Sequence, residues 1–156
     1  MLGRFYEDFE VGEVLETPGR TITEADLVNF AGVSGDFFSL HVDEEYAKKT
    51  MFGRRIAHGL LTLAVVSGFW AKMGLFEGTL VAFYGIDKLR FTKPVYIGDT
   101  IRARIEVVGK EEKGRYGLVT LKHEVYNQNG ETVMVFDAKL LFKRRDEQKS
   151  PEKALS

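Results

Sequence analysis

Residues 59–73 read GLLTLAVVSGFWAKM, and this segment decides the fold. Apolar side chains occupy most of its positions, so a helix built from it carries them on most of its sides instead of along one stripe. A helix of that kind is buried all round in a folded protein. The segment is too short for a transmembrane helix, which needs roughly 20 apolar residues. The sequence therefore predicts a central helix that the rest of the chain covers.

Four segments after this helix have the composition of β-strands, because they are rich in β-branched and aromatic residues with stretches of alternating polarity. They are residues 80–92, 99–110, 115–127 and 131–144. The pair Asn129-Gly130 separates the last two segments and predicts a tight hairpin turn. One apolar helix followed by four antiparallel strands predicts an α+β fold, in which a curved sheet wraps the helix.

The chain before the central helix predicts two shorter helices. Thr23 and Asp26 have the spacing of a capping box, so a helix is expected to begin there and to end near Gly32. A loop is expected over residues 34–42. Asp43 is then expected to begin the second short helix, which has acidic residues in its first turn and lysines in its last.

The composition is that of a single soluble domain. We expect the domain over residues 1–145, with an extended lead-in over residues 1–20 and a disordered polar tail over residues 146–156. The formal net charge of -1 gives no basic surface, so neither nucleic acid nor a membrane is expected as a partner. The absence of cysteine excludes disulfides and a cysteine nucleophile. The first residues, MLGRFYEDFE, lack the apolar core of a signal peptide, so we expect a cytoplasmic protein.

Residues 34–41 place a carboxylate and an imidazole, Asp36 and His41, on one short segment. An aspartate and a histidine aimed at one point can hold a water molecule between them, because the carboxylate accepts a proton and the imidazole donates one. The alternative is that Asp36 caps the local turn, as aspartate often does, and that His41 is a structural histidine. The two residues alone leave both interpretations open.

A second feature, His58-Gly59, leads directly into the central helix and favours the catalytic interpretation. A helix N-terminus presents unpaired N–H groups, and a glycine there lets a ligand approach the backbone closely. Such an N–H can stabilise the oxygen of a thioester carbonyl as it becomes enolate-like. The alternative is that Gly59 only makes room at a tight turn. We expect a structural role for His58, and an exposed position in a polar strand for His123.

Together these motifs resemble the MaoC-like dehydratases, a family that includes the R-specific enoyl-CoA hydratases. The resemblance is carried by SGD at residues 34–36, LHVD at 40–43, YA at 46–47, FG at 52–53 and IAHG at 56–59. Flanking matches are GRTIT at residues 19–23, LRFTKPV at 89–95 and GD at 98–99. The resemblance covers residues 5–143, and the combination is far more specific than any single motif.

The resemblance implies a hotdog fold, and it implies no metal or redox cofactor. In the family the residues that match Asp36 and His41 hold the catalytic water, Gly59 supplies the oxyanion N–H, and Ser67 supports the catalytic loop by hydrogen bonding. The implied reaction is the reversible hydration of a 2-enoyl thioester, an acyl-CoA, to a 3-hydroxyacyl thioester. A homodimer or larger homo-oligomer is implied as well, and a second copy would also cover the edges of the predicted sheet.

The chain departs from the family at Phe38 and Ser39, where the family usually has Asn-Pro. Phe38 cannot make the polar contacts of asparagine, and Ser39 does not stiffen the loop as proline does. Phe38 is therefore expected to narrow or line the substrate tunnel, or to change the activity. Two other functions stay open for this reason: a hotdog acyl-CoA thioesterase and a non-catalytic acyl-thioester-binding protein.

Basic residues near these motifs are candidates for binding the phosphates of CoA. They are Arg54, Arg55, Arg90 and Lys93. The alternative for each of them is a solvated surface charge. The sequence does not indicate the length or branching of the acyl chain, the stereochemistry, or whether CoA or a carrier protein holds the thioester.

Overall fold

The computed structural model describes residues 2–149. Its elements are η1 (Tyr6–Asp8), β1 (Val14–Glu16), β2 (Arg20–Thr21), α1 (Glu24–Ser34), α2 (Ser39–Val42), α3 (Glu44–Lys48), α4 (Gly59–Lys72), β3 (Leu80–Phe91), β4 (Thr100–Lys113), β5 (Tyr116–Tyr126), β6 (Thr132–Lys143) and η2 (Arg145–Lys149). The apolar segment forms α4, and the four segments after it form β3 to β6. The predicted α+β organisation is therefore confirmed.

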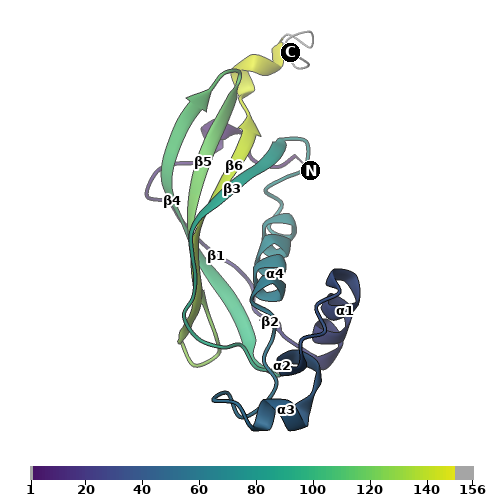
Figure 1. Cartoon of the computed structure of the whole chain (residues 1–156). Helices are drawn as coiled ribbons and strands as arrows, with labels where there is room; N and C mark the ends of the chain where they lie inside the picture. The colour runs from purple at the N-terminus through teal and green to yellow at the C-terminus, as the bar shows by residue number, and fades with distance from the viewer. Residues whose placement is uncertain (1, 150–156) are drawn as a thin grey trace.

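The strands form a curved antiparallel sheet, and α4 lies along its concave face (Figure 1). The strand order is β1-β4-β5-β6-β3, and β2 also pairs with β4. Helices α1, α2 and α3 gather at one end of the sheet, beside the end at which α4 begins (Figure 1). The fold thus brings the loop after α1 and the start of α4 to the same place.

The hydrophobic core lies between α4 and the sheet. Four alternating residues of β4, namely Ile101, Ala103, Ile105 and Val107, are completely buried and belong to the same cluster as Val66 of α4. Burying each of these isoleucine and valine side chains contributes about 1.5–3 kcal/mol. Among residues 2–149, no helix is both long enough and apolar enough to cross a membrane.

Helix α4 is not buried all round, and the prediction that it would be is wrong for the single chain. Leu60 is 60% exposed, and Ala64 and Gly68, which follow it at four-residue spacing on the same side, are exposed too. The sheet covers only one side of the helix, where Val66 and Phe69 are buried. The opposite side stays open.

His123 is also not where it was expected. Its side chain is completely buried because it points inward from β5, while its polar neighbours Lys122 and Glu124 are exposed. The indole N–H of Trp70 donates a hydrogen bond to Nε2 of His123 at 2.7 Å, and Nδ1 lies 2.8 Å from the carbonyl oxygen of Leu121. Since both contacts fit the neutral ring, and since burial disfavours the charged form, the pKa of His123 is lowered to about 4.

The buried His123 predicts a loss of stability in mild acid. The unfolded chain binds a proton at this histidine below about pH 6.5, whereas the folded chain does so only near pH 4. The free energy of unfolding should therefore be highest above pH 6.5 and fall by about 3 kcal/mol toward pH 4 from this group alone. Urea unfolding at several pH values, compared between the wild type and His123→Gln, measures the difference. Equal pH slopes in the two proteins would contradict the prediction.

The first part of the chain follows the sequence with two differences. The capping box is confirmed, because Thr23 and Asp26 exchange side-chain to backbone hydrogen bonds. Helix α1 continues past Gly32 to Ser34, because the left-handed cap is Gly35, with φ of 78°. The lead-in contains strands β1 and β2, and the expected loop contains the short helix α2.

The first residues of the expected tail are ordered in a short helix. Residues Arg145–Lys149 form η2, and the guanidinium of Arg145 binds both carboxylate oxygens of Asp8 at 2.9 Å. This bidentate ion pair holds η2 against η1. The rest of the expected tail, residues 150–156, lies outside the described residues.

Candidate active site

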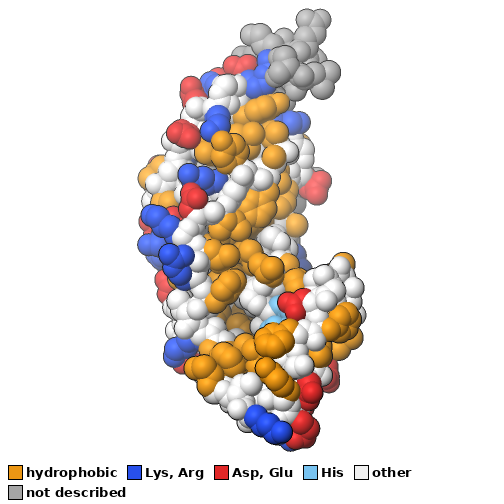
Figure 2. All heavy atoms as spheres, in the orientation of Figure 1, with side chains coloured by type: hydrophobic (Ala, Val, Ile, Leu, Met, Phe, Trp, Pro, Cys, Tyr) orange, Lys and Arg blue, Asp and Glu red, His pale blue; other side chains and the backbone are white. Residues whose placement is uncertain are grey.

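A cavity of about 490 Å³ lies where the helical end of the molecule meets the sheet. Most of its lining is apolar, and His41 and Gly59 also line it. The other lining residues are Met51, Phe52, Ile56, Ala57, Leu60, Thr62, Phe91, Thr92, Lys93, Pro94, Val95 and Val133. Figure 2 shows hydrophobic side chains around this hollow, with histidine and acidic atoms side by side at its rim. Such a cavity suits an acyl chain with a reactive polar end.

Asp36 and His41 come together, as the sequence predicts, and His41 lines the cavity. A carboxylate oxygen of Asp36 and ring nitrogens of His41 and His58 all lie within 4.8 Å of one another. Two hydrogen bonds of about 2.8 Å to one water span a distance of this size. The geometry therefore allows a water molecule to bind between Asp36 and His41. Asp36 is held in its turn by the N–H of Phe38, which donates to its carboxylate at 3.2 Å.

The environment of His41 determines how it can transfer protons. Its Nδ1 lies 2.8 Å from the carbonyl oxygen of Ile56, and a carbonyl only accepts, so Nδ1 carries a hydrogen and Nε2 is free to exchange a proton. Only 9% of its surface is exposed. Burial lowers the pKa of His41 below its ordinary value and nearby His58 adds to this, while the bond to Ile56 and the charge of Asp36 oppose the shift. At neutral pH the ring is therefore neutral, with an unprotonated Nε2.

This environment predicts how His41 titrates. In the free protein its midpoint should lie below the ordinary value of 6.5, because burial favours the neutral ring. The neutral form should carry its hydrogen on Nδ1. Nitrogen–proton NMR spectra of histidine-labelled protein across pH 4–8 measure both properties, and His41→Gln assigns the signal. A midpoint at or above 6.5 would argue against this account.

Gly59 is the first residue of α4, and no side chain caps this helix end. A Cβ added at Gly59 would lie 2.7 Å from the ring of Phe91, so the ring of Phe91 occupies the place of the missing side chain. The unpaired N–H groups of the first helical turn thus lie beside the cavity that Gly59 lines. This position fits the oxyanion role that the resemblance implies.

Phe38 does not line the cavity, contrary to the expectation that it narrows the tunnel. Its ring meets the ring of His41 edge-on at 5.8 Å and that of Tyr46 at 5.9 Å. Phe38 therefore contacts the rings of His41 and Tyr46, and 53% of its surface stays exposed. Its effect on the site acts through the position of His41.

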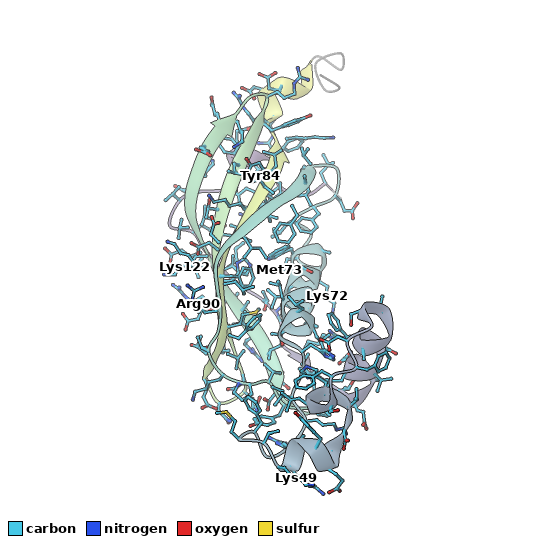
Figure 3. The ribbon with its side chains drawn as sticks, viewed as in Figure 1. Lys49, Lys72, Met73, Tyr84, Arg90 and Lys122 are labelled. Atoms are coloured by element: carbon cyan, nitrogen blue, oxygen red, sulfur yellow. The ribbon has the colours of Figure 1, made fainter. Side chains whose placement is uncertain are left out.

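Two predicted site residues do not join this cluster. The hydroxyl of Ser67 donates to the carbonyl oxygen of Ala64 at 2.6 Å, within its own helix, and makes no hydrogen bond to the loop. Arg90 lies on the convex face of the sheet, away from α4 (Figure 3), and its guanidinium donates to the carbonyl oxygen of Leu89. Alternation along β3 accounts for this, because the next residue, Phe91, points into the cavity.

The other basic residues differ in whether their side chains can bind the phosphates of CoA. Arg55 is held between the carboxylates of Glu24 and Glu44 at 2.7 and 2.6 Å, so it joins α1 to α3. The guanidinium of Arg54 lies 4.0 Å above the ring of Tyr96. Arg54 and Lys93 line a second, polar cavity of about 300 Å³, and Lys93 also lines the first.

His58, for which the sequence predicts a structural role, lies directly against the residues of this site. It is buried, at 2% exposed, and its Nε2 lies 3.0 Å from the backbone carbonyl oxygen of Asp36. Its ring stacks on that of His41 with 3.9 Å between centroids. Because the carbonyl only accepts, Nε2 of His58 carries a hydrogen, and metal ligation through that nitrogen would break this bond. The only sequence signal was its place directly before Gly59.

The comparisons with known proteins support the family resemblance. The model of the MaoC like domain matches residues 8–129. The (R)-specific enoyl-CoA hydratase of Rhodospirillum rubrum is 39% identical over 105 residues, which are 67% of this chain and 70% of that protein. Protein MaoC of Klebsiella aerogenes is 40% identical over 110 residues, which are 70% of this chain but only 32% of that longer protein.

Solved structures agree as well. A monoamine oxidase regulatory protein from Archaeoglobus fulgidus superposes with a TM-score of 0.86 at 41% identity, covering 92% of this chain and 97% of that one. A Mycobacterium tuberculosis protein with a double hotdog fold has a TM-score of 0.79 at 24% identity, covering 96% of this chain and 45% of that one, and it shows the fold alone. The chain has the hotdog fold and belongs to the MaoC-like dehydratase family.

Proposed function

We propose that the protein catalyses the reversible hydration of a trans-2-enoyl thioester to a 3-hydroxyacyl thioester. The observation that carries this proposal is the pair Asp36 and His41, in which a carboxylate oxygen and a ring nitrogen lie within 4.8 Å of each other beside an apolar cavity. The start of α4 at Gly59 lies at the same cavity. The hydratase named among the relatives supports the reaction class.

In hydration, the carboxylate of Asp36 takes a proton from water as the water oxygen bonds to the β-carbon of the substrate. The protonated ring of His41 gives a proton to the α-carbon. The proton on Asp36 then returns to His41 through the next bound water, so both residues are restored and one water is added in all. The N–H of Gly59 stabilises the enolate-like oxygen between these events, and one such donor can contribute about 3 kcal/mol in the transition state. If Asp36 and His41 divide the acid and base roles differently, the same atoms take part.

Dehydration runs through the same states in reverse. The neutral ring of His41 accepts the α-proton at Nε2, and the protonated carboxyl of Asp36 gives a proton to the leaving hydroxyl. The lowered pKa of His41 keeps this ring neutral at physiological pH. Because the pKa of His41 is lowered, only a small fraction of His41 is protonated when hydration begins. Hydration therefore uses that fraction, or His41 first takes a proton from the water.

The substrate in this proposal is an acyl-CoA. The apolar cavity would hold the acyl chain. The polar cavity beside it would hold the phosphates of CoA. Arg54 and Lys93 are the candidates for those phosphates, although Lys93 is paired with Glu131 in the free protein. The outward position of Arg90 removes it from this set.

We also propose that the protein works as a homodimer or a larger homo-oligomer. Strand β3 lies at the edge of the described sheet, and its side chains Val81 and Tyr84 are exposed together with the ring of Phe83. An unpaired edge with exposed apolar side chains is covered in natural proteins, and a second copy can continue the sheet there. Light scattering after size exclusion measures the mass. Val81→Lys should give a monomer, and a monomeric wild type would contradict the proposal.

The function is tested by hydration of crotonyl-CoA and longer trans-2-enoyl-CoA substrates, followed by the loss of enoyl thioester absorbance. We expect hydration without release of free thiol. Free thiol, detected with a thiol reagent, would identify a thioesterase instead. Tight binding of the acyl-CoA without turnover at any chain length would identify a binding protein, and either result would overturn the proposal.

A further inference from the structure

We propose that His58 is a positioning residue, which fixes the catalytic loop to α4 and sets the place of both Asp36 and His41. The proposal rests on the proposed hydratase function, and it names the residue that gives the catalytic pair its geometry. His58 does not line the cavity, so it acts through its neighbours.

The first contact is the hydrogen bond from His58 Nε2 to the carbonyl oxygen of Asp36 at 3.0 Å. The other hydrogen bonds that hold residues 35–38 in the described structure are local. They join Gly35 to Ala31, Asp36 to Ser34, Phe37 to Gly35, Phe38 to Asp36 and His41 to Phe38. His58 therefore makes the hydrogen bond that ties this segment to a distant part of the chain.

The second contact is the ring stack. The imidazoles of His58 and His41 are 3.9 Å apart at an interplanar angle of 26°. Phe30 of α1 lies against the ring of His58 at 4.9 Å, and Phe38 meets the ring of His41 at 5.8 Å. His41 is thus held between two rings, and the bond from its Nδ1 to Ile56 fixes its rotation.

The third contact is with the helix itself. His58 is the N-cap residue of α4, and its carbonyl oxygen accepts from the N–H of Thr62 at 3.2 Å. One residue is therefore bonded to the segment of Asp36, stacked on His41 and adjacent to Gly59. A shift of His58 moves all three groups relative to one another.

These contacts act on a loop that has few other supports. Phe38 and Ser39 stand where asparagine and proline would fix the loop, and the hydroxyl of Ser67 is used within α4. The hydrogen bond and the ring stack of His58 constrain this loop from outside it. Losing about 1 Å of alignment at a reacting pair can cost about 10²-fold in rate.

Three variants separate the contributions. His58→Phe keeps a ring to stack but has no donor for Asp36, His58→Gln keeps a donor but has no ring, and His58→Ala has neither. We expect kcat for crotonyl-CoA hydration to fall by about 10²-fold in His58→Ala with little change in KM, and to fall less in each of the other two. Wild-type kcat in all three variants would overturn the proposal.

A readout without substrate keeps the test independent of the hydratase proposal. His58 contributes to lowering the pKa of His41, so the NMR titration midpoint of His41 should rise in His58→Phe and His58→Gln. A His58 side chain that does not act on His41 would leave this midpoint unchanged, and that result would also overturn the proposal. If the wild type lacks hydratase activity, the function fails, whereas the titration still tests the positioning role.

Phe9→Leu is the matched control for loss of stability. Phe9 is buried and packs against Phe142 with 4.7 Å between ring centroids, in contacts that involve none of the site residues. It should lower the melting temperature by a few degrees, as a core substitution does, and leave kcat and the His41 midpoint unchanged. A His58 variant that loses no more stability than Phe9→Leu but loses kcat shows a positioning effect.

Discussion

Replacing Asp36 with asparagine or His41 with glutamine is expected to lower kcat for crotonyl-CoA hydration by about 10²–10⁴-fold each. Asparagine keeps the shape of Asp36 and cannot take a proton from water, and glutamine in place of His41 cannot exchange one with the α-carbon. The measurement is the loss of enoyl absorbance under saturating substrate.

Circular dichroism and the melting temperature serve as controls for folding in these two variants. Asp36 is exposed, so its substitution should leave stability nearly unchanged. The double variant should be little slower than the worse single one, because residues that act as a unit are not additive. Unchanged activity in both single variants would remove Asp36 and His41 from the mechanism.

Gly59→Ala is expected to have the second large effect, on both activity and stability. The added Cβ would lie 2.7 Å from the ring of Phe91, so either the ring or the start of α4 must move. Overpacking of this kind costs about 1–3 kcal/mol. A displaced oxyanion donor costs about 10²-fold or more in kcat. Steady-state kinetics and urea unfolding measure the two effects.

A second substitution shows whether the contact with Phe91 is the cause. Gly59→Ala combined with Phe91→Ala leaves room for the new Cβ, and it should recover most of the lost stability. Phe91→Ala alone is the matched control, because Phe91 also lines the cavity. Wild-type kinetics and stability in Gly59→Ala would show that neither the contact nor the N–H matters.

The main elements of the fold could be predicted because their patterns are local. Alternation in the segment with Ile101 and Ile105 identifies β4, since every second side chain enters the core. Strands β1 and β2 were missed because they have three and two residues and depend on pairing with β4. The open side of α4 and the burial of His123 were not predicted. Both depend on which elements pack against α4 and β5, and the spacing of apolar residues along the sequence does not show this.

The site residues that belong to sequence motifs were predicted, whereas contacts that depend on tertiary packing were not. The motif matches gave Asp36, His41 and Gly59, and the fold brings the first two together and places His41 and Gly59 on one cavity. The contacts of Phe38 and Ser67, by contrast, depend on rotamers and on nearby acceptors. The contacts of His58 could not be predicted from the sequence, because its hydrogen bond goes to a backbone carbonyl 22 residues away.

The bond between Trp70 and His123 has a practical consequence. Trp70 is the only tryptophan of the chain, and it lies 1% exposed between α4 and the sheet, beside Phe76 and Phe83. Its fluorescence therefore reports the docking of the central helix without any label. Protonation of His123 near pH 4 would put an additional hydrogen against the indole N–H, so acid should change the emission at the moment the helix loosens from the sheet.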